Sequence, residues 1–241
     1  MAFLEETFVL SSSEADLHQR IKLSAVLRHM QDAASHHLTA LGFPPQRMQA
    51  AHQVFLLSKV EIQFAGSPLP DQQVTVFTRP HPPKGAFFLR ETNLAVEGRT
   101  LITGKAAWVL ADDRTHQVLR PSVFDWEDPF DPVEFDGAIA RRRLHAPEHV
   151  SPLGVRRIRY SDLDGNRHMN NAVYGDILFD FLPAEWSARP LRQAVLIYEH
   201  EALLGDELAI AGAPCGIDSW YLAGHRDGAR CFSAELQFDR G

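Results

Sequence analysis

The chain has 241 residues, of which 45% are hydrophobic and 23% charged, with a formal net charge of −7 and a pI near 5.9. This is the composition of an ordinary globular protein, and its acidic balance argues against a nucleic-acid-binding protein that relies on a basic surface. The length suits two units of about 120 residues each better than it suits one.

Cysteine content and apolar runs indicate the cellular compartment. Two cysteines, Cys215 and Cys231, are too few for a disulfide framework and suit a reducing cytoplasm. The N-terminus lacks the basic flank and long apolar run of a signal peptide. No apolar run approaches the ~18 residues of a membrane span. We therefore expect a cytoplasmic protein that does not associate with membranes.

The first half of the sequence predicts a strand, one long helix and four further strands. Residues 3–10 are typical of an opening strand. From Ser24 to Leu41 apolar residues recur mostly at spacings of three and four, which predicts a helix capped by Ser24 and ended by Gly42 and Pro44. Strand-like runs follow near 53–64, 72–79, 86–96 and 101–111, separated by turn-forming glycine and proline.

The second half repeats this order after an interruption. Residues 121–149 carry several prolines, acidic residues and Arg141-Arg142-Arg143, a composition typical of a linker. A strand is then predicted over 155–160, a helix over 172–181, and strands near 193–202, 207–213, 218–223 and 230–238. An offset of 147 residues aligns apolar positions of the two helices. We therefore expect an α+β protein made of one duplicated unit.

One segment, residues 160–171, is rich in polar and ionisable side chains and directly precedes an apolar helix. In an extended stretch, alternation would place Asp164, Asn166 and His168 on one side. Carboxylate, amide and imidazole groups are the components of a hydrolase site, and a helix start adds N–H groups able to stabilise an oxyanion. The alternative is a polar loop that merely caps the helix.

Residues 161–174 read Ser-Asp-Leu-Asp-Gly-Asn-Arg-His-Met-Asn-Asn-Ala-Val-Tyr, which resembles the catalytic segment of the acyl-ACP thioesterases of plants and bacteria. The first-half helix, from Met30 to Phe43, is similar to the helix of their hotdog domains. The resemblance covers most of the chain. It implies two tandem hotdog domains, each a long helix wrapped by a curved antiparallel β-sheet. We expect a non-catalytic domain over 1–135 that forms the acyl-pocket wall, a linker over 136–149 and a catalytic domain over 150–241.

The resemblance also implies four catalytic residues. Asp164, Asn166 and His168 match the family motif, and Glu201 matches a family glutamate on the strand after the helix. Glu199, two residues earlier, is expected on the same side and is the competing candidate. Ala202 stands where the plant enzymes have cysteine, which argues against a thiol nucleophile. In the implied mechanism Asp164 attacks the thioester or activates water, Asn166 and the helix start hold the carbonyl oxygen, and His168 and Glu201 manage protons.

The implied activity is hydrolysis of fatty acyl-ACP to free fatty acid and holo-ACP, which ends fatty-acid synthesis, with no cofactor and no metal. Acyl carrier protein is acidic, so we expect a basic docking face, for which Arg141–Arg143 and Arg156, Arg157 and Arg159 are the candidates. A hotdog acyl-CoA thioesterase and a non-catalytic module that binds acyl thioesters are the alternatives. The open sheet edges of this fold favour a homodimer.

Overall fold

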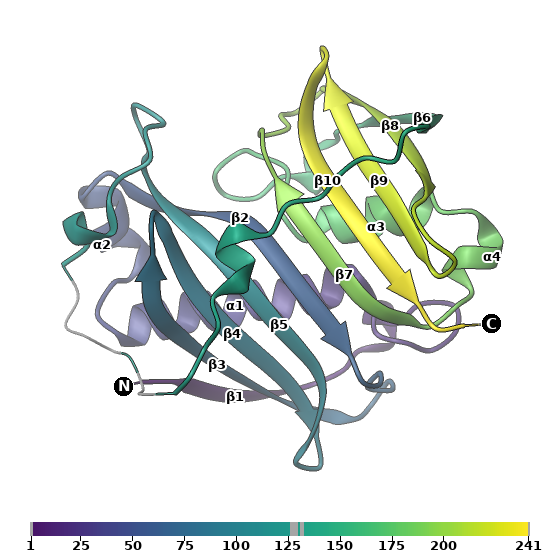
Figure 1. Ribbon diagram of the computed structural model, residues 1–241. Coiled ribbons are helices and arrows are strands. Elements are labelled where there is room, and N and C mark those ends of the chain that lie inside the picture. The colour runs from purple at the N-terminus through teal and green to yellow at the C-terminus, as the bar shows by residue number, and fades with distance from the viewer. Residues whose placement is uncertain (1, 126–129, 131–132, 241) are drawn as a thin grey trace.

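The computed structural model describes residues 2–125, 130 and 133–240 (Figure 1). Its first half contains β1 (Leu4–Val9), α1 (Leu23–Ala40), α2 (Pro45–Ala50), β2 (Gln53–Phe64), β3 (Gln73–Lys84), β4 (Phe87–Val96) and β5 (Arg99–Asp112). The second half contains β6 (Ser151–Arg157), α3 (Val173–Asp180), α4 (Ala184–Ser187), β7 (Leu191–Tyr198), β8 (Glu207–Pro214), β9 (Ser219–Arg226) and β10 (Ala229–Phe238). Short 3-10 turns are η1 (Ser12–Glu14), η2 (Pro121–Val123), η3 (Ala138–Arg141) and η4 (Tyr160–Asp162). The predicted α+β class is confirmed.

In the described chain ten strands form one antiparallel sheet that crosses both halves. Its order is β1-β3-β4-β5-β2-β7-β10-β9-β8-β6, so each half has the same order when read outward from the β2–β7 junction. That junction pairs Lys59 with Ile197 and Gln63 with Gln193 at its two ends. The duplicated pattern of the sequence thus corresponds to a two-fold arrangement in space, with a shared sheet in place of two separate ones.

The helices α1 and α3 lie on one face of this sheet, each against the strands of its own half (Figure 1). They contact each other at their N-terminal ends, where a β-carbon on Gly175 would lie 2.6 Å from the backbone nitrogen of Ser24. Ser24 is buried inside α1 and its hydroxyl donates to Asp176 of α3 at 2.5 Å. The expectation that Ser24 caps α1 is wrong, because the helix begins one residue earlier, with Lys22 at the cap position.

A buried apolar cluster continues between the two halves. It includes Leu27 of α1, Ile62 of β2, Leu178 of α3 and Phe232 of β10. Side chains alternate along the strands, so one set faces the helices and this cluster while the other set faces away. The sheet and this cluster are both shared by the two halves, and the first half adds two smaller buried clusters, one around Phe88 and Leu110 and one around Leu89 and Ala107.

The connecting segment crosses the opposite face of the sheet (Figure 1). Ile139 and Ala140 of η3 pack against Leu89 and Ala107, and the ammonium of Lys59 donates to the carbonyl of Ala140 at 2.8 Å. The segment predicted as a linker therefore covers sheet surface in addition to joining the halves. Residues 126–129 and 131–132 of the predicted proline-rich stretch lie outside the described residues.

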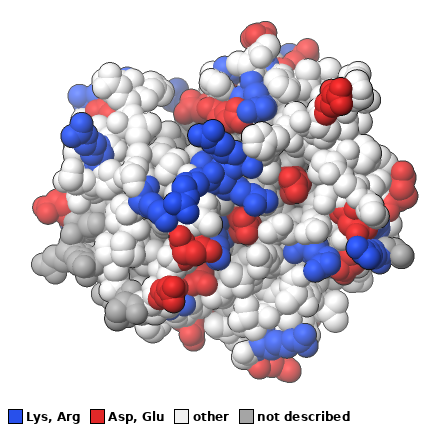
Figure 2. All heavy atoms as spheres, in the orientation of Figure 1, with Lys and Arg blue, Asp and Glu red and all other residues white. Residues whose placement is uncertain are grey.

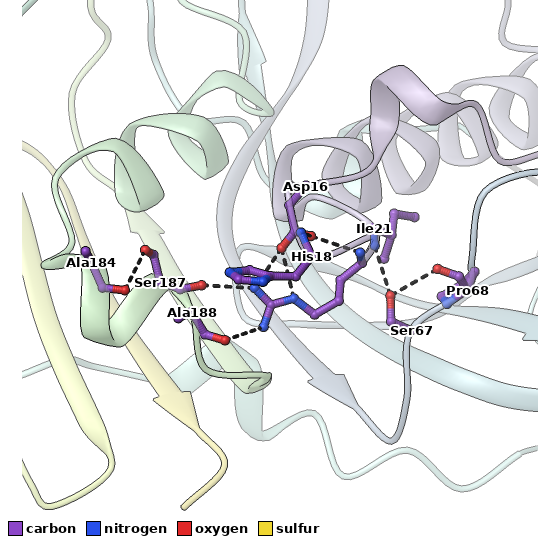
Figure 3. Close-up of polar contacts among 9 residues, drawn as sticks. Asp16, His18, Ile21, Ser67, Pro68, Ala184, Ser187 and Ala188 are labelled. Atoms are coloured by element: carbon purple, nitrogen blue, oxygen red, sulfur yellow. Dashed lines mark hydrogen bonds and ion pairs between the residues drawn. The ribbon is translucent and has the colours of Figure 1, made fainter. Parts of the chain in front are cut away.

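A second connection between the halves lies where the turn before α1 meets α4 (Figure 3). The guanidinium of Arg20 donates to the carbonyls of Ser187 and Ala188 at 2.9 and 3.2 Å. Asp16 accepts from the Arg20 Nε at 2.9 Å and from the backbone N–H groups of His18 and Arg20. Asp16 thus holds Arg20 in the orientation that reaches the second half.

None of the helices in the described chain combines the length and apolar character required to cross a membrane. Among the same residues, no group of three or more histidine, cysteine, aspartate or glutamate side chains is placed to hold a metal ion.

Candidate active site

The polar segment before α3 begins with a structural carboxylate. Asp162 is buried, and its two oxygens accept from the Arg156 guanidinium and from the backbone N–H of Arg159, each at 2.7 Å. These bonds fix the end of η4 and attach it to β6. Asp162 and Arg156 are therefore occupied with each other, and Arg156 is not part of an open basic face.

Residues 164–168 form a tight turn. The backbone N–H of Asp164 donates to the carbonyl of His168 at 2.9 Å, and that of Arg167 donates to the carbonyl of Asp164 at 3.0 Å. Arg167 has a φ of 68°, which allows the chain to reverse. The Oδ1 of Asp164 accepts the backbone N–H of Asn166 at 2.8 Å. The predicted extended alternation is wrong, because a reversing turn does not keep every second side chain on one side.

Three of the four predicted catalytic residues share a pocket. Asn166, His168 and Glu201 line it together with Gly165, whereas Asp164 is not among its lining residues. The Nε2 of His168 lies 3.2 Å from the Oε2 of Glu201. The turn therefore places the amide and the imidazole at the pocket, while the Asp164 carboxylate is bonded to the backbone of the turn.

Glu201 lies beyond the end of β7, which closes at Tyr198. The backbone N–H of Met169 donates to the carbonyl of Ala202 at 2.8 Å, and this bond brings Glu201 beside the turn. Glu199 points elsewhere, since both of its oxygens accept from the Arg230 Nε, at 2.8 and 2.9 Å. The expectation that Glu199 and Glu201 share one side is wrong, because the strand ends between Tyr198 and Glu201 and strict alternation ends with it.

The start of α3 does not face the pocket. The backbone N–H of Ala172 donates to the Asn170 side chain at 2.8 Å, and that of Val173 donates to the Asn170 carbonyl at 2.9 Å. No α3 residue lines the pocket. The predicted use of helix-start N–H groups as oxyanion donors is therefore not supported, and Asn170 satisfies the helix start.

The pocket has a volume of about 690 Å³ and is formed mainly by the first half of the chain. Its apolar wall lies between α1, α2 and strands β2, β4 and β5, and includes Leu38, Phe43, Met48, Phe55, Phe88 and Trp108. Sequence reasoning did not single out these residues, because each also fits an ordinary core position. The sequence signal that could have indicated this wall was the presence of aromatic residues on three strands. These residues come together only when the strands pair in the sheet.

Polar side chains interrupt this apolar wall. Arg90 of β4 lines the pocket, is 8% exposed, and donates from Nη1 to the Nδ1 of His37 at 3.2 Å and the hydroxyl of Thr78 at 3.1 Å. Burial lowers the pKa of Arg90 to about 10, so the guanidinium is charged at neutral pH. The pocket thus combines an apolar wall, a buried cation and an amide–imidazole–carboxylate group.

Two family models match the chain on either side of the connecting segment. The acyl-ACP thioesterase N-terminal domain matches residues 2–122, and the acyl-ACP thioesterase C-terminal domain matches residues 149–238. The chain belongs to the acyl-ACP thioesterase family. This thioesterase is accordingly a thioester hydrolase, and the tandem arrangement of its two halves is that of the family.

Solved structures of similar fold include two members of this family. An acyl-ACP thioesterase from Bacteroides thetaiotaomicron is 18% identical, with a TM-score of 0.84, covering 98% of this chain and 98% of that one. The 12:0-ACP thioesterase from Umbellularia californica is 19% identical, with a TM-score of 0.84, covering 98% and 97%. No curated protein sequence matches the thioesterase. At these identities the likeness establishes the fold, and the predicted tandem hotdog architecture is confirmed.

Proposed function

We propose that this thioesterase hydrolyses fatty acyl-ACP to free fatty acid and holo-ACP, with Asn166, His168 and Glu201 as its catalytic group and Asp164 as the residue that positions them. The observation that carries the proposal is that Asn166, His168 and Glu201 line one pocket, where the His168 Nε2 lies 3.2 Å from the Glu201 Oε2. In this proposal the first domain, 1–135, supplies the wall for the acyl chain, 136–149 connects, and 150–241 carries the chemistry.

The contacts support a particular division of roles. Glu201 and His168 take a proton from a water molecule, whose oxygen then attacks the thioester carbonyl carbon. The side-chain amide of Asn166 donates to the carbonyl oxygen as it becomes negative. Collapse of the tetrahedral intermediate breaks the C–S bond, and the departing thiolate of the carrier takes the proton. Attack by a carboxylate through an anhydride is the competing route, and labelled water in a single turnover separates the two.

Asp164 is a positioning residue in this proposal, in contrast to the nucleophile or base expected from the sequence. Its Oδ1 accepts the Asn166 N–H at 2.8 Å and it does not line the pocket. Its contribution is to hold the turn that presents the Asn166 amide and the His168 ring.

The neighbouring glutamates provide a matched pair of variants for testing the proposal. Glu201→Gln removes the carboxylate beside His168 and is expected to lower kcat/KM on acyl-ACP by about 100-fold or more, the usual contribution of a general base. Glu199→Gln keeps Glu201 and is expected to stay within about threefold of the original enzyme. Comparable losses in both variants, or none in Glu201→Gln, would refute the assignment.

In our proposal the acyl chain of the substrate is carried by acyl carrier protein. The alternative to be excluded is that the enzyme prefers acyl-CoA. Figure 2 shows lysine and arginine side chains gathered over the connecting segment near the centre of one face. Arg141 and Arg143 are exposed there, and Arg157 and Arg159 are exposed beside the active-site segment. Charge complementarity of this kind favours an acidic partner. Acyl-ACP and acyl-CoA of equal chain length are to be compared, and a higher kcat/KM for acyl-CoA would contradict the proposal.

We further propose that the enzyme acts in the cytoplasm as a homodimer. Both cysteines are free, as suits a reducing compartment. Strands β1 and β6 end the sheet, and each has one edge without a partner strand in the described chain. Light scattering at working concentration tests the oligomeric state, and a monomer mass would rule out the dimer.

A further inference from the structure

We infer that the acyl pocket is adapted to chains that carry an oxygen atom remote from the thioester, as a hydroxyl or a carboxylate. This inference rests on the proposed function and concerns the substrate class of the same site. Its basis is the pocket wall, where a buried cation and two unpartnered polar atoms stand among apolar residues.

The cation is Arg90. Its side chain extends from β4 toward α1, because its guanidinium contacts His37 of that helix, and the residue lines the pocket. Its guanidinium donates to the His37 ring and to the Thr78 hydroxyl, and among the described residues no carboxylate forms an ion pair with it. A buried charge without a counter-charge is unfavourable unless hydrogen bonds compensate for the lost water.

Two further polar atoms of the pocket wall are also buried without a compensating partner. The side-chain oxygen of Gln31 and the indole nitrogen of Trp108 are buried, and neither has a hydrogen-bond partner in the described chain. Both residues line the pocket with Arg90. Such atoms in a native structure call for an explanation, and a bound ligand that supplies the missing partner is one. The three side chains come from α1, β4 and β5, so the sheet register and the helix packing have assembled them.

These groups discriminate between kinds of acyl chain. A plain alkyl chain offers no acceptor to the Arg90 guanidinium and leaves the indole N–H of Trp108 and the Gln31 oxygen unpaired. An oxygen on the chain accepts from the guanidinium or the indole N–H, and a hydroxyl also donates to the Gln31 oxygen. A site built to bond a substrate oxygen rejects the analogue that lacks it, because its own buried groups are then left unpaired.

The experiment compares plain, ω-hydroxy and ω-carboxy acyl-ACPs over a series of chain lengths. We expect kcat/KM for at least one oxygenated class to exceed that of the plain chain of equal length by about tenfold or more, as a hydrogen bond to a charged group allows. The two oxygenated classes distinguish a hydroxyl from a carboxylate as the favoured group. A plain chain hydrolysed as well as its oxygenated counterparts at every length would overturn the inference.

Arg90→Met keeps an unbranched apolar stem and removes the guanidinium, so we expect it to abolish the preference for oxygenated chains. Arg79→Met is the matched control, because Arg79 lies on the adjacent strand β3 and pairs with Glu91 at 3.0 Å, outside the pocket lining. If Arg90→Met does not fold, Trp108→Phe keeps an aromatic ring while removing the indole N–H and is expected to weaken the preference. A preference unchanged in the folded variants would also overturn the inference.

Failure of the inference and failure of the proposed function give different results. If no acyl-ACP of any class is hydrolysed, the proposed function is wrong. If plain and oxygenated chains are hydrolysed alike, the function stands and the inference about the pocket is wrong.

Discussion

At the scale of single residues, three carboxylates in and near the active site have very different roles. Asp162 is buried against Arg156, Asp164 accepts a backbone N–H within its own turn, and Glu201 pairs with His168 at the pocket. Nothing in the side chains themselves separates these roles. The difference arises from which donors the local backbone places beside each carboxylate.

Glu91 is a further carboxylate whose surroundings have a measurable consequence. The His81 imidazole and the Arg79 guanidinium beside it hold the pKa of Glu91 at about 2, against an ordinary value of 4.5. A depressed folded-state pKa contributes stability that is present above pH 4.5 and is lost as the pH falls through about 2. We therefore expect Glu91→Gln to lower Tm at neutral pH, with the Tm difference from the original protein shrinking between pH 4.5 and pH 2.

Thermal melts of Glu91→Gln and Glu5→Gln over this pH range test the prediction. Glu5 is exposed on the edge strand β1, so its substitution is expected to change Tm little at any pH. A Tm difference for Glu91→Gln that stays constant down to pH 2 would contradict the assigned cause.

At the scale of elements, the two helices approach closely because α3 carries glycine at the crossing point. A β-carbon at Gly175 would lie 2.6 Å from the nitrogen and 2.9 Å from the Cα of Ser24. Both are backbone atoms of α1, so a rotamer change cannot relieve the contact. Close approach, and not helix propensity, explains glycine in the first turn of α3.

Gly175→Ala is accordingly expected to destabilise the protein although alanine is the better helix former. Overpacking of this kind typically costs about 1–3 kcal/mol in free energy of unfolding. Gly216→Ala is the control, since its β-carbon would approach Ser219 no closer than 3.8 Å. Denaturant titration of both variants gives the comparison, and an unchanged or raised stability for Gly175→Ala would show that the helices separate without cost.

At the scale of the whole molecule, the two halves are joined by the β2–β7 pairing, the shared apolar cluster and the Arg20 contacts. Since one continuous sheet and the cluster that contains Leu27, Ile62, Leu178 and Phe232 span both halves, we expect both to unfold in one cooperative transition. Calorimetry tests this directly, because the calorimetric and van't Hoff enthalpies agree only for a two-state transition.

Arg20→Met removes the bonds to Ser187 and Ala188 while keeping an apolar stem against the same surface. We expect the single transition to remain and the free energy of unfolding to fall by about 1–2 kcal/mol, as for hydrogen bonds from a partly exposed charged group. Arg99→Met, at an exposed position that begins β5, serves as the control. A melt that splits into two steps in Arg20→Met would mean that this contact, and not the sheet, couples the halves.

Much of the fold was predictable because its signals are local. The apolar spacing of α1 and the run that became β2 reflect helix and strand periodicity, which depends only on neighbours along the chain. The repeated order of elements likewise indicated a duplicated unit and which half holds the polar segment. The residues Asn166, His168 and Glu201 were identified through their resemblance to a family motif, and the structure brings these three together.

What the sequence by itself determined is therefore the set of elements, their duplication and the chemical types at the candidate site. Tertiary structure decided the rest: that Asp164 bonds its own turn, that Glu199 faces Arg230 while Glu201 faces His168, and that Arg90 lies in the pocket wall. The physical reason is that these outcomes depend on where strands end and on which distant strand or helix packs alongside. Periodicity describes the faces of one element, but the partner of each face is set only when the sheet is assembled.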